Sequence, residues 1–82
     1  MENFYNMYVN EMETRLEEIT GVQMIGIDYG ENSIVIFAGS DTNKVTDYFK
    51  KKDIWFERFI EDGDDYIKAK TVVISELIKE RV

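Results

Sequence analysis

Two β-rich runs joined by a short turn constrain the fold of this 82-residue chain more than any other stretch. The runs are Val22–Tyr29 and Ser33–Ala38, and Gly30-Glu31-Asn32 separates them with residues that turns favour. The second run is apolar from Ile34 through Phe37, which is typical of a strand covered on both faces. The sequence therefore predicts an antiparallel hairpin whose second strand lies inside the sheet.

Two further segments have the patterns of helices. Residues 3–20 carry apolar side chains at three- and four-residue steps, and Gly21 stands where a glycine would end the helix. Ser40-Asp41-Thr42-Asn43 is a run of residues that cap helix N-termini, so a second helix is expected to begin there. Lys50-Lys51-Lys52 is expected to close it, because cations suit the negative end of the helix dipole.

Residues 54–74 allow two interpretations. As strands, Trp55–Glu61 and Tyr66–Thr71 form a second hairpin around a turn that contains Asp62-Gly63. As helices, Gly63 ends one helix and Asp64 begins the next. The β-branched and aromatic residues of this segment favour the hairpin.

With Gly63 and Asp64 as its loop residues, the second hairpin pairs Ile60 with Ile67 and Glu57 with Lys70. The last segment, Val73–Val82, has the apolar spacing of a short helix.

The predicted fold class is α+β, in one domain over residues 1–82. It comprises a small four-stranded antiparallel sheet of two hairpins and two to three helices, in the order α-β-β-α-β-β-α. The helices are expected on one face of the sheet, with Gly26 in the first strand letting a helix pack closely. The order αββαββ resembles a ferredoxin-like fold with its termini moved, which is a resemblance of architecture and not of function.

Charge and composition restrict the function. Seventeen acidic and ten basic residues give a net charge of −7, which disfavours direct binding to nucleic acid or to anionic membranes and favours a basic protein surface. Solubility alone would also account for this charge. The N-terminus lacks the features of a signal peptide and no apolar run is long enough to span a bilayer, so the expected location is the cytoplasm.

Catalytic and metal-binding motifs are not evident. Because the sequence contains no histidine and no cysteine, thiolate and imidazole ligands are excluded and no spacing pairs a nucleophile with a base. The acidic run from Glu61 to Asp65 offers oxygen ligands for Ca²⁺ or Mg²⁺ but lacks the spacing of an EF-hand, so a solvated hairpin tip is favoured. We expect no enzymatic activity, no metal and no cofactor.

The candidate partner-binding residues are acidic side chains of the first helix and of the two hairpins, with a tyrosine beside each hairpin tip. They are Glu13, Glu17, Asp28, Tyr29, Glu31, Glu61, Asp62, Asp64, Asp65 and Tyr66. On one side of the molecule they would present spaced negative charges to a basic groove, as a nucleic-acid backbone does. In size, acidity and lack of catalytic groups the chain resembles small phage-encoded inhibitors, including anti-CRISPR and DNA-mimic proteins.

The sequence thus predicts a non-catalytic acidic protein that blocks a larger, basic partner that handles nucleic acid. Two alternatives stay open. One is a ligand-binding or regulatory domain with a pocket between the first helix and the sheet. The other is a homo-oligomeric interaction domain, for example a homodimer joined through sheet edges or the aromatic face of the first helix.

Overall fold

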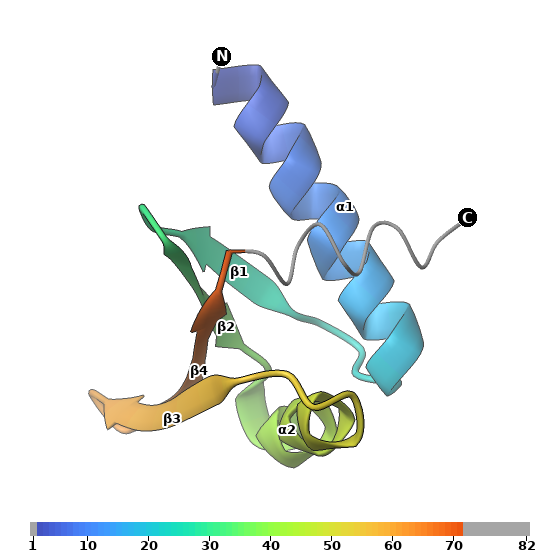
Figure 1. The fold of residues 1–82 in the computed structure, drawn as a ribbon, viewed down its shortest axis with the longest axis vertical. Coiled ribbons are helices and arrows are strands. Elements are labelled where there is room, and N and C mark those ends of the chain that lie inside the picture. The colour runs from blue at the N-terminus through green and yellow to red at the C-terminus, as the bar shows by residue number, and fades with distance from the viewer. Residues whose placement is uncertain (1, 72–82) are drawn as a thin grey trace.

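A four-stranded antiparallel sheet carries two helices on one face in the computed structural model, which describes residues 2–71 (Figure 1). The elements in chain order are α1 (Glu2–Thr20), β1 (Gly26–Tyr29), β2 (Ser33–Phe37), a 3₁₀ turn (Gly39–Asp41), α2 (Thr42–Lys51), β3 (Phe56–Glu61) and β4 (Asp64–Lys70). The predicted α+β class, the αββαββ order and the antiparallel sheet are confirmed. The helix predicted over Val73–Val82 lies outside the described residues.

The strands lie in the order β1-β2-β4-β3, and every neighbouring pair is antiparallel. The two hairpins therefore meet through β2 and β4, which leaves β1 and β3 as the edge strands. A ferredoxin-like sheet would have this order if its termini were joined and its chain reopened before its first helix.

Alternation along the strands divides the sheet into two faces. On the face toward the helices, Ile34 and Ile36 of β2 lie beside Ile67 and Ala69 of β4, and all four are buried. Apolar residues of the two helices complete the core: Met12, Leu16, Val45 and Phe49. Met12 and Leu16 of α1 are fully buried in this core.

The second helix begins within the predicted run Ser40-Asp41-Thr42-Asn43, but its first turn is stabilised differently from the prediction. A 3₁₀ turn precedes it, Gly39 has a φ of +58°, and Thr42 Oγ1 donates a hydrogen bond of 3.0 Å to the Gly39 carbonyl oxygen. The Asp41 side chain makes no capping hydrogen bond with the helix and instead lies 3.8 Å from Lys44 Nζ. The polar run therefore builds a turn, and α2 starts at Thr42.

The second hairpin is confirmed, but its predicted register is wrong. Asp62 and Gly63 have φ values of +52° and +82°, as the two loop residues of a type I′ turn require. Glu57 consequently pairs with Lys68, and Ile60 pairs with Asp65 rather than with Ile67. An Asp-Gly loop tolerates left-handed backbone at both positions, which explains the preference for this register.

Two predictions about the covering of the first hairpin are also wrong. No helix within residues 2–71 packs on Gly26, which is exposed, and no atom of these residues lies within 4 Å of the position that a Cβ would take. Within residues 2–71, helices cover only one face of β2, and on its other face Val35 is half-buried and Phe37 is 39% exposed. The uncovered side of this apolar strand therefore belongs to the molecular surface.

Candidate functional site

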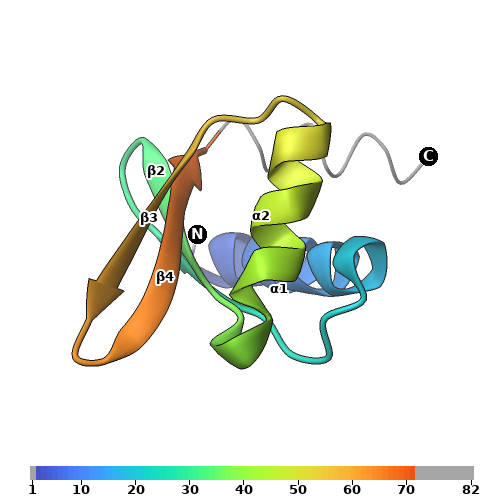
Figure 2. The ribbon, with the colours of Figure 1, turned by 90° about the horizontal axis from the view of Figure 1, so that it is seen from below.

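The sheet face turned away from α1 and α2 is here called the open face. Figure 2 shows both helices on the same side of the strands, so no helix within residues 2–71 lies on the opposite side. Strand register and alternation place eleven side chains on the open face. They are Asp28, Ser33, Val35, Phe37, Glu57, Phe59, Glu61, Asp64, Tyr66, Lys68 and Lys70.

A row of aromatic rings crosses the open face. Gly26, Phe37, Tyr66 and Phe59 are successive cross-strand partners on β1, β2, β4 and β3. The Tyr66 ring lies 5.5 Å from the Phe37 centroid and 5.4 Å from the Phe59 centroid, and it stacks on Phe59. The row ends at Gly26, which has no side chain to cover Phe37. A preformed aromatic strip therefore lies at the surface.

Carboxylates from both hairpins surround this strip at Tyr66. Partial burial raises the pKa of the Tyr66 hydroxyl, and the negative charges of four carboxylates raise it further: Asp64, Glu61, Asp62 and Asp28. These four were candidate partner-binding residues, as was Tyr66 itself. The structure places Asp28, Glu61 and Asp64 on the open face with Tyr66, and Asp62 in the adjoining β3–β4 turn.

Two surface hollows flank the Tyr66 ring. The first, of about 380 Å³, lies on the Phe37 side and is bordered by Gly26, Asp28, Asp64 and Glu13 as well. The second, of about 300 Å³, lies on the Phe59 side and is bordered by Asp28, Val35 and Glu61. Each hollow thus combines aromatic walls with carboxylate oxygens.

An apolar groove of about 530 Å³ continues from the first hollow past the end of the sheet. Gly26 and Phe37 border both, and Met24, which is 80% exposed, lies on the far side of the groove. Exposed apolar area beside a charged rim is the usual composition of a protein-binding surface.

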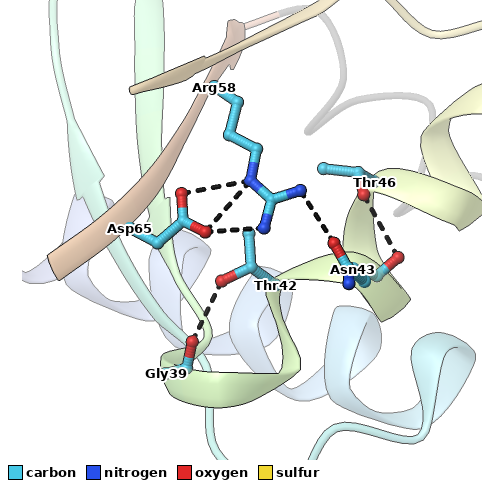
Figure 3. Close-up of polar contacts among 6 residues, drawn as sticks. All are labelled: Gly39, Thr42, Asn43, Thr46, Arg58 and Asp65. Atoms are coloured by element: carbon cyan, nitrogen blue, oxygen red, sulfur yellow. Dashed lines mark hydrogen bonds and ion pairs between the residues drawn. The ribbon is translucent and has the colours of Figure 1, made fainter. Parts of the chain in front are cut away.

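Asp65 is a candidate residue that the structure places elsewhere. Its side chain lies on the face toward the helices, where Arg58 Nε and Nη2 donate hydrogen bonds of 3.0 Å and 2.6 Å to Asp65 Oδ2. Arg58 Nη1 also donates to Asn43 Oδ1 of α2 over 2.7 Å (Figure 3). The hydrogen bonds from Arg58 lower the pKa of Asp65. This acid therefore links the β3–β4 hairpin to α2.

Glu13 and Glu17 project from α1 onto the outer edge of β1. Glu13 Oε2 accepts a hydrogen bond of 2.8 Å from the Ile27 amide, and Glu17 Oε2 accepts one of 2.8 Å from the Ile25 amide. Glu13 therefore occupies a backbone donor of the edge strand β1, and Glu17 occupies the donor of the residue just before that strand. Glu13 in addition borders the first hollow.

The remaining candidates lie apart from Tyr66. Tyr29 shares the side of β1 that carries Ile27, so it faces away from the aromatic row. Glu31 lies in the β1–β2 turn, next to the end of β4, because Thr71 N donates to Asn32 O over 3.3 Å. The Asp62-Gly63 turn begins the same strand at its other end. The hairpin tips thus point to opposite ends of the sheet.

Sequence reasoning missed the apolar half of the site, namely Gly26, Val35, Phe37 and Phe59. One signal was available, since the run Ile34–Phe37 is apolar at positions that face both sides of its strand. With helices on one face only, half of such a run has to lie on the other.

In the part of the chain that the structure describes, no three carboxylates are placed to hold one metal ion. The helices within residues 2–71 include none with the length and hydropathy to cross a membrane. Comparison of the chain with protein families, curated proteins and solved structures found no match.

Proposed function

We propose that this chain is a non-catalytic binding protein whose open face occupies and blocks a basic surface of a larger protein that handles nucleic acid. One observation carries this function: Asp28, Glu61 and Asp64, which come from two hairpins, border hollows in an aromatic strip at the surface beside Tyr66. Surfaces that bind nucleic acid are rich in lysine and arginine, which an acidic face complements.

The two components of the face have separate physical roles in such a complex. Aromatic rings provide the buried area from which most binding energy at interfaces arises. Carboxylates around the rings speed association with a basic partner and select against acidic ones. The net charge of −7 extends this attraction over the whole molecule.

The end of the second hairpin also supports a binding role. Glu61 and Asp64 are direct cross-strand partners, and like charges in that position destabilise a sheet. A cationic partner between the two side chains would remove this repulsion. The presence of both charges at this position is therefore understandable if they bind a cation from outside the chain.

Affinity capture from an extract of the host cells tests the function with two matched double variants. Asp28→Lys with Asp64→Lys reverses two charges on the open face, and Glu18→Lys with Asp47→Lys reverses two exposed charges on the helices. We expect the first pair to reduce capture of a basic partner by about tenfold or more and the second pair to leave it within about twofold.

Circular dichroism establishes that both variants are folded, and the captured partner has to bind more weakly as salt rises. Equal capture by the two double variants would contradict the proposed function. So would a partner whose affinity is the same at low and moderate salt.

A further inference from the structure

We infer that the open face binds two arginine side chains of the partner, one on each side of the Tyr66 ring. This inference rests on the proposed function and names the side chains that the partner has to present. It follows from the two hollows, which share Tyr66 as a common wall.

The first hollow offers a guanidinium group both of its preferred contacts. The rings of Phe37 and Tyr66 supply faces for stacking, and Asp28 and Asp64 supply carboxylate oxygens. Because Gly26 has no side chain, the hollow is open toward β1 and an arginine can enter along the sheet surface.

The second hollow lies on the other side of Tyr66, where the Phe59 ring stacks on the Tyr66 ring. Phe59 takes the place of Phe37, and Glu61 takes the place of Asp64. Asp28 and Val35 border both hollows, so the two sites are adjacent. At about 380 and 300 Å³ and open to solvent, each hollow is at or near the lower limit for small-molecule sites and suits one side chain.

The spacing of the hollows matches alternate residues of an extended segment. The outer walls of the two hollows, Phe37 of β2 and Phe59 of β3, stand two strand spacings or about 10 Å apart, so the hollows on either side of Tyr66 are closer together than this. Residues i and i+2 of an extended chain project to the same side about 7 Å apart. An Arg-x-Arg segment lying across the strands therefore places one guanidinium group in each hollow.

Arginine fits these hollows better than lysine does. Its planar guanidinium group stacks on a ring while its N–H groups bind a carboxylate, whereas an ammonium group is a compact and strongly hydrated charge. The lysines of the open face lie farther along the strands, where Lys68 pairs across from Glu57 and Lys70 Nζ lies 5.5 Å from the Trp55 ring centroid.

Single-stranded nucleic acid also stacks on exposed aromatic residues of sheets. Here its phosphates would approach the carboxylates that surround Tyr66, which repel them. An arginine-bearing protein segment is therefore the occupant that both the rings and the charges favour.

Nuclear magnetic resonance titration of the ¹⁵N-labelled protein tests this inference with four probes. The first three are acetylated and amidated peptides, Gly-Arg-Ser-Arg-Gly, Gly-Lys-Ser-Lys-Gly and Gly-Arg-Ser-Ala-Gly, and the fourth is a hexamer of oligothymidine. We expect the two-arginine peptide to shift the amides of Gly26, Phe37, Phe59 and Tyr66 and to bind about two- to fivefold more tightly than either other peptide.

A variant that fills one hollow provides the structural control. Gly26→Val adds a side chain where no atom lies within 4 Å, so we expect a folded protein whose first hollow is blocked. It should bind the two-arginine peptide no more tightly than the one-arginine peptide. Thr14→Val introduces the same valine side chain at an exposed position of α1 and should change nothing.

Equal affinity for the arginine and lysine peptides would overturn the inference. So would absence of binding at millimolar peptide, shifts confined to other parts of the chain, or indifference to Gly26→Val. Tighter binding of oligothymidine would assign the face to nucleic acid instead. Equal affinity for the arginine and lysine peptides, absence of peptide binding, or shifts confined to other parts of the chain would each leave the proposed function standing if the Asp28→Lys, Asp64→Lys variant still loses its partner. If that double variant keeps its partner, the proposed function itself is contradicted.

Discussion

Tyr66 is the residue at which the charge and the apolar surface of this protein meet. Its ring lies between Phe37 and Phe59, and its hydroxyl lies in the field of carboxylates from both hairpins. The hydroxyl is protonated at neutral pH even with an ordinary tyrosine pKa, and the raised pKa extends its role as a hydrogen-bond donor to more alkaline pH. A cation bound there would lower this pKa toward its ordinary value.

Neutralising Asp64 separates its contribution to binding from its contribution to stability. Asp64→Asn should lower the pKa of Tyr66, because one of the charges that raise it is removed. It should also stabilise the fold by about 0.2–1 kcal/mol, because it relieves the repulsion from Glu61. The pKa is measured from the Tyr66 Cζ chemical shift against pH, and the stability from urea denaturation.

Asp47→Asn on α2 is the control, since Asp47 is exposed and is not among the charges that raise the Tyr66 pKa. An Asp64→Asn protein with an unchanged Tyr66 pKa would show that the carboxylates do not converge on the ring.

Neighbouring acids of one sequence run have different environments in this structure. Strand alternation already indicates that Asp65 shares the buried side of Ile67 and Ala69, whereas Asp64 shares the opposite side with Tyr66. The partner of Asp65 could not be predicted, because Arg58 reaches it only in the register that the Asp62-Gly63 loop imposes. Composition alone treats the two aspartates as equivalent.

Helix α1 covers one side of the core and also lies along the outer edge of β1. Its apolar residues Met12 and Leu16 are buried, while Glu13 and Glu17 accept hydrogen bonds from amides at the outer edge of β1. Hydrogen bonds to charged acceptors are among the stronger ones in proteins. These two glutamates therefore protect an edge strand from pairing with other chains.

Removing both acceptors should weaken this edge. We expect Glu13→Ala with Glu17→Ala to lower the free energy of unfolding by about 1–3 kcal/mol and to promote self-association through β1. Urea denaturation and light scattering measure the two effects. Glu18→Ala, at an exposed neighbouring position, should change stability by no more than about 0.5 kcal/mol.

The double variant Glu13→Gln with Glu17→Gln keeps an acceptor oxygen at each position. Its free energy of unfolding should lie between that of the original protein and that of the double alanine variant. A double alanine variant as stable and as monomeric as the original protein would contradict the role given to these side chains.

The sequence predicts each hairpin separately, but it does not predict how the two hairpins pair within the sheet. Each hairpin shows in the sequence through its own turn and β-rich runs. The pairing of β2 with β4 joins residues far apart in the chain, and no local pattern specifies it. Because this pairing places Phe37 beside Tyr66, the aromatic strip could not be found from the sequence alone.

At the scale of the molecule, the two faces of the sheet differ within residues 2–71. Toward the helices, apolar residues are buried and Arg58 holds Asp65 and Asn43 together. On the open face, rings and carboxylates stand at the surface within residues 2–71. The net charge of −7 was known from the sequence, but the gathering of its carboxylates around Tyr66 required the structure.

Because the chain contains no cysteine, a bulky label at one introduced cysteine tests directly whether the open face binds the partner. Val35→Cys places a maleimide adduct between the two hollows, and Asp47→Cys places the same adduct on α2. We predict that the adduct at position 35 abolishes capture of the basic partner, while the unlabelled variant and the adduct at position 47 retain it. Undiminished capture by the protein labelled at position 35, or loss of capture only when position 47 is labelled, would contradict the account.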